Sequence, residues 1–423
     1  MIQDTAKDIL QKGYVCDHCL GRQFGQILSG MTNRERGHAI RTVLAMEYSI
    51  KSFPIDRANF QDFKFRREKP QARPAGKNPL EGAKAPSLQK ECRICNGLFE
   101  SLRKWAEQAS KKLEPLEFRT FVVTSSLARE LVRKEEGLWE DVGIEHCEPM
   151  KSELNRELGK LVAERTGKEP DEKDPDVSIL LDLENSRLDV HANPLFIYGR
   201  YQKLVRGMPQ TKWERFGESV EDVIAKPFMQ ASGGRAHSLH AAGREDMDAR
   251  CLAWRPFVLE IESPRKRDLP LQRMEKEIAR TKKVRVSELR PSSRGEVSRV
   301  KALMPDKTYR ALASLGKPVA ESDLKKLKRI SVVKQRTPAR VAHRRADKTR
   351  AKRVKSVAWK VRPKNRVEFI IRGEAGLYVK ELLSGDNGRT RPSFSEILGT
   401  PVRTEELDVI QIHLPEKRAK GRV

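Results

Sequence analysis

The sequence predicts an α+β protein in two parts, and three observations support this fold class. With 423 residues, the chain is long enough for two or three domains. Two Cys-x-x-Cys pairs predict a small metal-bound region in the N-terminal part. From about residue 117 onward, runs with the composition of strands alternate with runs of helical periodicity. We expect an N-terminal part over residues 1–190 and a C-terminal part over residues 191–423.

The first 90 residues are expected to contain short helices and one long loop. Residues 33–48 have helical periodicity, and Thr32 is a residue type that caps a helix N-terminus. Residues 61–90 are rich in Lys, Arg, Pro, Ala and Gly, a composition that cannot build a hydrophobic core. We therefore expect a mobile basic loop there, with ordered structure returning at the second cysteine pair.

The segment from about residue 117 to residue 190 has an α/β pattern. The runs "FRTFVVTS" and "VSILLDLE" predict strands, and "SLARELVRKEE" predicts a helix. The stretch "LDVHANPLFIYGRY" is expected to extend into one further strand. A second helix is predicted by an apolar face that stops before Gly167 and consists of Leu154, Leu158, Leu161 and Val162.

The charge balance favours a polyanionic partner. There are 85 Lys and Arg against 59 Asp and Glu, which gives a net charge of +26 and a pI of about 9.9. Nucleic acid is the first interpretation and an acidic membrane surface the second. Solubility in a hot or salty cytosol is a third, but it usually recruits charges of both signs.

Residues 325–364 hold over half of this excess charge. They contain 17 Lys and Arg and a single acid, Asp347, so their net charge is +16. Valine and isoleucine residues are interleaved with the charges, which predicts strands or a ribbon rather than a tail. A solvated loop is the alternative; we favour a basic finger that lies along a phosphate backbone.

Composition also indicates the compartment. No apolar run approaches the roughly 18 residues of a membrane-spanning helix. The N-terminus lacks the basic and apolar regions of a secretory signal. Six cysteines in a chain of this length do not form a disulfide framework. We expect a protein of the reducing cytoplasm.

Two Cys-x-x-Cys knuckles predict a closed tetrahedral zinc site of the structural kind. They pair Cys16 with Cys19 and Cys92 with Cys95. The 72 residues between the pairs exceed the spacing of a compact zinc ribbon, but the fold can bring distant knuckles together. A redox pair is the alternative, although such a pair usually stands alone. His18 is not required by a four-sulfur site, and we expect Cys147 and Cys251 to be buried fillers.

The stretch "HAAGREDMDARC", residues 240–251, is dense in charge and lies beside an expected strand. It is either a solvated turn or the place of a reactive carboxylate. An aspartate with an ordinary pKa of about 3.9 is ionised at neutral pH without special tuning. In an extended segment, Asp246 and Asp248 would share one face and Glu245 would point to the other.

Five stretches together resemble the archaeal and eukaryotic tRNA pseudouridine synthases of the "ten" class, which in archaea are tRNA pseudouridine(54/55) synthases. The resemblance implies an N-terminal zinc-binding and THUMP-like RNA-binding domain. It also implies a C-terminal synthase domain with a mixed, largely antiparallel sheet and a cleft between its halves. The stretches are "FIYGRYQKLVRGMPQTKW", "HAAGREDMDARC", "KTYRALASLGKP", "QRTPARVAHRRADKTRAKRV" and "GLYVKELLSGDNGRTRPSFSEILG".

The resemblance also implies a function. The expected reaction isomerises uridines 54 and 55 of the tRNA T-loop by breaking the N1–C1′ bond and rejoining the base through C5. It needs one ionised carboxylate, either as a nucleophile at C1′ or as a base at C2′, and no organic cofactor. The uridine must leave its stack to be reached. The family further suggests a monomer that binds tRNA.

In the family's "GRED" motif the aspartate is catalytic, and here it is Asp246. Arg244 resembles the arginine that fills the hole left by a flipped base, although pairing with local acids is as good an interpretation. Tyr309 matches the tyrosine that stacks on the uracil, and Tyr378 matches a second substrate-contacting tyrosine. Lys380 takes the place of the cation paired with the catalytic aspartate.

Two further expectations follow from the resemblance. Leu382 or Leu383 would pack beneath the base. The family usually has a glycine-containing turn where this chain reads "CLAWRPF", so we expect an altered turn at Ala253 and Trp254. Two other functions stay open: a zinc-containing tRNA-binding protein without catalysis, and another THUMP-bearing tRNA-modifying enzyme, which would need a cofactor loop or further catalytic cysteines.

Overall fold

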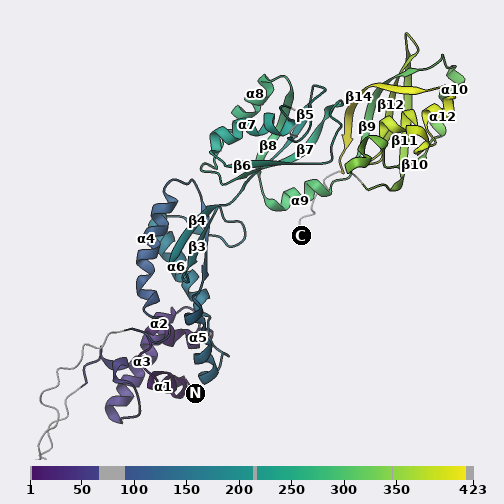
Figure 1. Cartoon of the computed structure of the whole chain (residues 1–423). Helices are drawn as coiled ribbons and strands as arrows, with labels where there is room; N and C mark the ends of the chain where they lie inside the picture. Colours follow the sequence, from purple (N-terminus) through teal and green to yellow (C-terminus); the bar gives the residue numbers. More distant parts are fainter. Residues whose placement is uncertain (1, 66–90, 213–216, 345, 416–423) are drawn as a thin grey trace, which may run out of the picture. The chain divides into compact units, whose positions relative to one another are not determined.

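The computed structural model describes residues 2–65, 91–212, 217–344 and 346–415. The chain forms two compact units, Met1–Asn193 and Pro194–Val423, which are drawn from purple to yellow along the chain in Figure 1. Most of the expected mobile loop at 61–90 lies outside the described residues.

Helices dominate the beginning of unit 1. The expected cap at Thr32 is confirmed, because its side chain accepts a hydrogen bond from the Glu35 N–H and the Glu35 carboxylate accepts one from the Thr32 N–H. Gly167 ends the last helix in the left-handed region, with φ +66°, as expected. The helices are α1 (Ile2–Gln11), α2 (Asp17–Gly21), α3 (Asn33–Ile50), α4 (Leu102–Leu113), α5 (Arg129–Val142) and α6 (Met150–Thr166), with short 3-10 turns at Arg22–Phe24, Arg57–Phe60 and Leu98–Ser101.

A four-stranded sheet completes unit 1. Its strand order is β2-β1-β3-β4, with β1 parallel to both neighbours and β4 antiparallel to β3. Leu154, Leu158 and Val162 of α6 are fully buried in the core that this sheet shares with the helices, whereas Leu161 is partly exposed. The strands are β1 (Thr120–Ser126), β2 (Glu169–Pro170), β3 (Val177–Asp182) and β4 (Arg187–Ala192).

The prediction of one strand across "LDVHANPLFIYGRY" is wrong. Strand β4 ends at Ala192, and β5 (Leu195–Lys203) begins three residues later in the sheet of unit 2. Pro194 has no N–H with which to continue a ladder, and the boundary between the two compact units falls between Asn193 and Pro194 in the sequence.

Unit 2 is built on one ten-stranded sheet. Its order is β13-β10-β11-β12-β9-β14-β7-β5-β8, and β6 pairs with β7 off this path. Among the described strands of this sheet, only the β14–β7 pair is parallel, which confirms the expected mixed, largely antiparallel sheet. The remaining strands are β6 (Ala236–Ala241), β7 (Arg250–Glu262), β8 (Val284–Ser292), β9 (Asp306–Leu315), β10 (Val332–Arg336), β11 (Thr349–Arg362), β12 (Arg366–Gly373), β13 (Thr390–Arg391) and β14 (Val402–His413).

The sheet divides into two halves, each with its own apolar core. Helices α7 and α8 cover the half that contains β5 to β8, and α10, α11 and α12 accompany β9 to β14 (Figure 1). The helices are α7 (Val220–Ser232), α8 (Leu271–Arg280), α9 (Arg294–Ala302), α10 (Glu321–Lys326), α11 (Val379–Ser384) and α12 (Phe394–Leu398), with 3-10 turns at Leu327–Arg329, Ala339–Arg344 and Asp386–Gly388.

Strand β14 joins the two halves, because it pairs with β9 on one side and with β7 on the other. Asp408 of β14 is buried and accepts hydrogen bonds from three guanidinium groups. They belong to Arg206 at 2.7 Å, Arg250 at 2.9 Å and Arg310 at 2.8 Å. One carboxylate therefore ties β14 to β7, to β9 and to the chain that follows β5.

The expected turn in "CLAWRPF" is also wrong, because β7 runs through it without a break. Ala253 faces the core while Trp254 points outward with 37 % of its surface exposed, which is the alternation of an ordinary strand. The irregularity lies instead in the pairing with β5, whose register shifts between Tyr201 and Lys203.

The basic segment 325–364 forms a ribbon, as its interleaved valines predict. Strands β10 and β11 pair antiparallel, and Val333, Val354 and Val357 are buried. Lysine and arginine side chains of β11, such as Arg353 and Lys355, are exposed.

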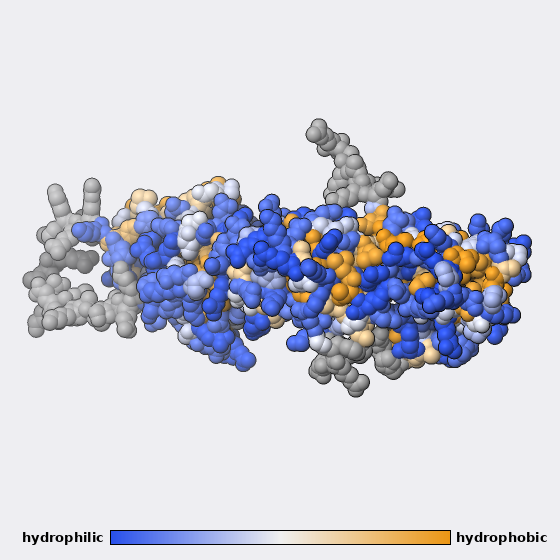
Figure 2. Space-filling model, turned by 90° about the horizontal axis from the view of Figure 1, so that it is seen from above, coloured by the Kyte–Doolittle hydropathy of each residue, from blue (hydrophilic) through white to orange (hydrophobic). Residues whose placement is uncertain are grey.

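Hydrophilic residues predominate on the face of the molecule in Figure 2, with apolar patches among them. Among the described residues, no helix is long and apolar enough to cross a membrane.

Candidate active site and metal centre

A cavity of about 490 Å³ opens between the two halves of unit 2. Its walls come from the β6–β7 loop, the start of β9, the 3-10 turn at Ala339–Arg344, the segment before α11, and β14. All five site residues expected in this part of the chain line the cavity, and Arg340 lines it with them. The polar side chains of interest on the wall are those of Arg244, Glu245, Asp246, Lys307, Tyr309, Arg340, Tyr378 and Lys380.

Asp246 lies in this wall between two cations. Its Oδ1 accepts a hydrogen bond from Arg340 Nη1 at 2.9 Å, and its Oδ2 lies 3.5 Å from Lys380 Nζ. Burial raises the pKa of Asp246, but the charges and hydrogen bonds of Arg340 and Lys380 outweigh burial and hold it below its usual value of 3.8. The carboxylate is therefore ionised, fixed in direction and open to the cavity.

Sequence reasoning missed Arg340. It lies in the stretch "QRTPARV", which belongs to the family resemblance, and it is one of many charges in the basic segment. The structure gives Arg340 a second carboxylate, Glu381 Oε1, at 2.7 Å from its Nε. Nothing in the sequence shows that residues 94 positions apart meet, so Arg340 could not be separated from its basic neighbours.

Lys380 contacts both aspartates of the stretch and lies closer to Asp248. Its Nζ is 2.6 Å from Asp248 Oδ2 and 3.5 Å from Asp246 Oδ2. The two carboxylates differ in exposure, because the Asp248 side chain is 65 % exposed and that of Asp246 is 29 % exposed. Asp246 lines the cavity and Asp248 is not part of its lining, so position favours Asp246 as the reactive group.

The other two charged residues of the motif differ in their surroundings. Glu245 is buried, where it accepts from Arg255 Nη2 at 2.9 Å and from the Tyr201 hydroxyl at 3.1 Å. Glu245 therefore points into the protein, away from Asp246, and has a structural role. Arg244 is exposed on the cavity rim and forms no ion pair with the described acids around it. Pairing with the local acids therefore does not account for Arg244.

Buried donors hold the backbone of the reactive loop. Lys203 Nζ, fully buried, donates to the carbonyl oxygens of Asp246 and Met247, both at 3.1 Å. Gln210 donates to the Gly243 carbonyl at 3.1 Å. Gly243 has φ +79°, and a Cβ there would lie 3.3 Å from the Lys307 ammonium, so glycine suits this position in both conformation and space.

The two tyrosines reach the wall from different elements, Tyr309 from β9 and Tyr378 from the segment before α11. Tyr309 is 9 % exposed, and burial raises its pKa to about 12, so its ring stays neutral. Tyr378 precedes α11, and its backbone N–H and carbonyl both bond to the side-chain amide of Gln335 at 2.9 Å. The expected leucines, Leu382 and Leu383, are fully buried in the core and do not line the cavity. Among the apolar lining residues near α11 are instead Leu377 and Val379.

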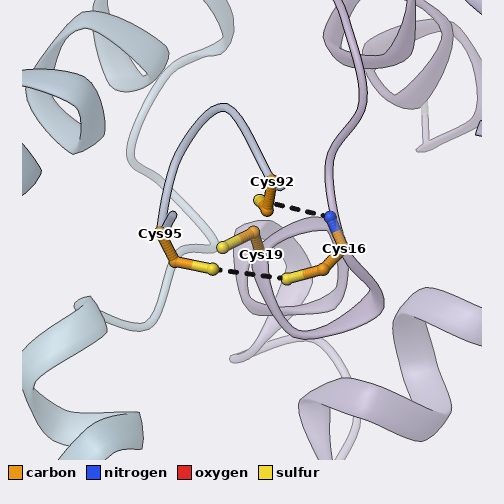
Figure 3. A group of neighbouring side chains, drawn as sticks. All are labelled: Cys16, Cys19, Cys92 and Cys95. Atoms are coloured by element: carbon orange, nitrogen blue, oxygen red, sulfur yellow. Dashed lines mark hydrogen bonds between the residues drawn. The ribbon is translucent and has the colours of Figure 1, made fainter. Parts of the chain in front are cut away.

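The four cysteines of the two knuckles converge in unit 1 (Figure 3). Their Sγ atoms all lie within 4.8 Å of one another, and Cys16 Sγ lies 3.6 Å from Cys95 Sγ. A tetrahedral site with metal–sulfur bonds of about 2.3 Å has sulfur–sulfur edges of roughly 3.8 Å. The separation of the sulfurs therefore fits a metal ion, and none of the six cysteines forms a disulfide.

The surroundings of the cluster also fit a metal. Four thiolates around a divalent ion carry a net charge of −2, and the buried Arg22 donates to Cys19 Sγ at 2.9 Å, where it offsets part of that charge. His18 turns away to Glu153, 2.8 Å from its Nδ1, so it is not needed as a ligand. Cys147 and Cys251 are buried outside the cluster, as expected.

Comparison with known proteins covers almost the whole chain. Residues 196–413 match the family model described as "Pus10, C-terminal", and residues 105–182 match "Pus10 THUMP domain, archaeal". The "tRNA pseudouridine synthase Pus10" of Methanothrix thermoacetophila is 40 % identical, over 96 % of this chain and 94 % of that protein.

Other matches have the same span. The proteins of the same name from Methanopyrus kandleri and Pyrococcus furiosus are both 38 % identical, over 96 % and 97 % of this chain and 98 % of each relative. Among solved structures, "Crystal Structure of a Cbf5-Nop10-Gar1 Complex" is similar with a TM-score of 0.30 and 18 % identity, over 49 % of this chain and 47 % of that chain.

Proposed function

This chain belongs to the Pus10 family of tRNA pseudouridine synthases, and we propose that it isomerises the T-loop uridines at positions 54 and 55 through Asp246. The activity of the family is the conversion of uridine in tRNA to pseudouridine. The observation that carries the residue assignment is the Asp246 carboxylate, ionised between Arg340 and Lys380 in the cavity wall.

The cavity residues supply the remaining roles in this proposal. The uridine leaves its stack and enters the cavity, where Tyr309 stacks on the base and Tyr378 contacts the nucleotide. Asp246 acts at the ribose, as nucleophile at C1′ or as base at C2′. Arg340 and Lys380 hold it in place and ionised. Arg244, free of local acids and exposed on the rim, fills the space that the flipped base leaves.

The rest of the chain binds the RNA in this proposal. The THUMP region and the basic ribbon of residues 325–364 contact phosphates, which orients the tRNA without reading its sequence. The four cysteines hold zinc, which stabilises unit 1 and takes no part in the reaction. The protein acts as a monomer on tRNA in the cytoplasm.

An unmodified tRNA transcript tests the target positions. Wild-type enzyme should form pseudouridine at 54 and 55, which chemical mapping resolves base by base. Transcripts with cytidine at 54 or at 55 should each keep one modified site. Pseudouridine found only outside the T-loop would contradict the proposed positions. If no uridine of the transcript is converted, catalysis by this protein is contradicted.

Arg340→Met should shift the acid side of the pH–rate profile to higher pH. Without Arg340, burial still raises the pKa of Asp246 and only Lys380 opposes it, so the carboxylate is protonated at a higher pH than in wild type. At neutral pH the rate should fall about tenfold or more, because the carboxylate loses its 2.9 Å partner and its fixed direction. Single-turnover rates between pH 4 and pH 8 measure both effects.

The ion pairs of Asp246 also change the free energy of unfolding with pH. The folded-state pKa of Asp246 is depressed, so the ion pair stabilises the fold above pH 4 and the contribution is lost as the pH falls through the folded pKa below 3.8. Arg336→Met is the matched control, since Arg336 lies in the same segment and pairs with the exposed Asp347. An unchanged acid limb in Arg340→Met would show that Arg340 does not tune Asp246.

A further inference from the structure

Lys307 lies in the cavity wall two residues before Tyr309 on β9. Alternate residues of a strand point to the same face, and their Cα atoms are roughly 7 Å apart. The Lys307 side chain is therefore on the Tyr309 face of the strand, deep in the wall, with only 7 % of its surface exposed. No role was assigned to Lys307 from the sequence.

Among the residues that the structure describes, the charge of Lys307 has no partner. Its ammonium makes no hydrogen bond or ion pair with any described residue. Glu245 is already bound by Arg255 at 2.9 Å, and burial raises the pKa of the Cys251 thiol to about 11, so that thiol is neutral. Arg255, Glu245 and Cys251 are the groups whose charges influence the pKa of Lys307. Arg255 and Glu245 neutralise each other and the Cys251 thiol is neutral, so the positive charge of Lys307 is not balanced by them.

A buried cation without a partner is costly to the folded protein. Burial, together with the neighbouring Arg255, lowers the pKa of Lys307 to about 8, which records that cost. The loop also leaves room for the ammonium, because a Cβ on Gly243 would lie 3.3 Å from both Lys307 Nζ and Arg255 Nη1. A residue that weakens the fold and faces the reaction cavity is expected to have its partner in the substrate.

We propose that Lys307 donates a hydrogen bond to a carbonyl oxygen of the target uracil and stabilises the negative charge on the base after the N1–C1′ bond breaks. This inference rests on the proposed placement of the uridine between Asp246 and Tyr309. The face that Lys307 shares with Tyr309 puts its ammonium at the edge of a base stacked on that ring, and carbonyl oxygens lie at the edge of uracil. A fixed donor in a closed site stabilises developing charge strongly.

The chemistry balances without another reactant. When the N1–C1′ bond breaks, its electron pair stays on the uracil, which becomes an anion with charge on its oxygens. The anion then bonds to C1′ through C5. C5 then loses its proton and N1, whose bond to C1′ was broken, gains one, so the number of protons is unchanged. Lys307 keeps its proton throughout and acts by charge and hydrogen bonding alone.

The test compares Lys307→Met with wild type on the same transcript. We expect a single-turnover rate about 100-fold lower, in the range found on removing one oxyanion donor elsewhere. The tRNA Kd should stay within about twofold, because a single flipped base adds little to an affinity dominated by phosphates. The thermal midpoint should be unchanged or higher, since a buried unpaired charge is removed. Lys307→Gln, which keeps a neutral donor, should fall between the two rates, and Lys276→Met on exposed α8 controls for charge.

Each contrary outcome has a distinct meaning. A wild-type rate in Lys307→Met overturns the inference. A weaker Kd with a shallower salt dependence and an unchanged saturated rate also overturns it, since Lys307 would then bind a phosphate. A lower thermal midpoint with a lost rate would mean a structural role and overturn it as well. Asp246→Ala in the same assay separates the proposals: if that variant is active, the site assignment itself fails.

Discussion

Asp246→Ala is expected to lower the single-turnover rate of pseudouridine formation by at least about 1,000-fold, the loss typical of removing a group that reacts with the substrate. No other carboxylate that lines the cavity is available, because Glu245 is bound by Arg255 and Tyr201. Binding of tRNA should change little, since phosphate contacts dominate it. Mapping on an unmodified transcript with enzyme in excess measures the rate.

The fold should survive this substitution. Arg340 keeps Glu381 at 2.7 Å and Lys380 keeps Asp248 at 2.6 Å, so neither cation is left without a partner. The thermal midpoint therefore separates a chemical effect from unfolding. Asp248→Ala is the matched control, because it removes a carboxylate from the same loop and the same lysine. If Asp248→Ala is the inactive variant and Asp246→Ala converts uridine, the roles of the two aspartates are reversed.

Loss of the proposed zinc ion is expected to unfold unit 1. Cys92→Ser removes one of four converging sulfurs, and structural zinc sites contribute apparent free energies on the order of 10 kcal/mol to the folds that they close. Cys19, Cys92 and Cys95 are buried in the single apolar core of unit 1, so the damage should spread through that core. Calorimetry should show loss of one transition while that of unit 2 remains, and metal analysis should fall from one ion per chain to none.

Two controls sharpen this experiment. Cys147→Ser changes a buried cysteine of the same unit that lies outside the cluster, so it should keep the metal. Wild-type protein treated with a strong chelator should resemble Cys92→Ser. Metal-free protein with an unchanged unfolding profile would show that the cysteines pack without needing an ion. Metal analysis also identifies the element, and a metal other than zinc would correct that part of the proposal.

Local signals in the sequence predicted much of the molecule. The cap at Thr32 and the helix end at Gly167 follow from residue types at short spacings. The two Cys-x-x-Cys pairs are far apart in the chain, but each is a local motif, and a four-sulfur site requires them to converge. The family resemblance, now supported by identities of 38–40 % over nearly the whole chain, implied the mixed sheet and the THUMP region. These features depend on chemistry that neighbouring residues share.

Features that depend on distant contacts were missed. Arg340 meets Asp246 across 94 positions, and in the sequence it is one arginine among many. Lys203 and Lys307 are buried, but lysine is usually an exposed residue, so the sequence does not single them out. The break at Pro194 was overlooked because apolar residues on both sides fit one strand, although they enter different sheets.

The late position of β14 in the chain has a consequence for biosynthesis. Leu407 and Val409 of β14 form part of the cavity wall, and Asp408 gathers arginines from two other strands and a loop. A nascent chain that has emerged from the ribosome only as far as β12 carries Asp246 but lacks this wall. Strands β7 and β9, which pair with β14 in the folded protein, then each have an unpaired edge, because their partner lies about 100 to 160 residues further along the chain. The active site is therefore completed only at the end of synthesis. A prematurely terminated chain exposes unpaired strand edges that can aggregate, and it cannot modify RNA.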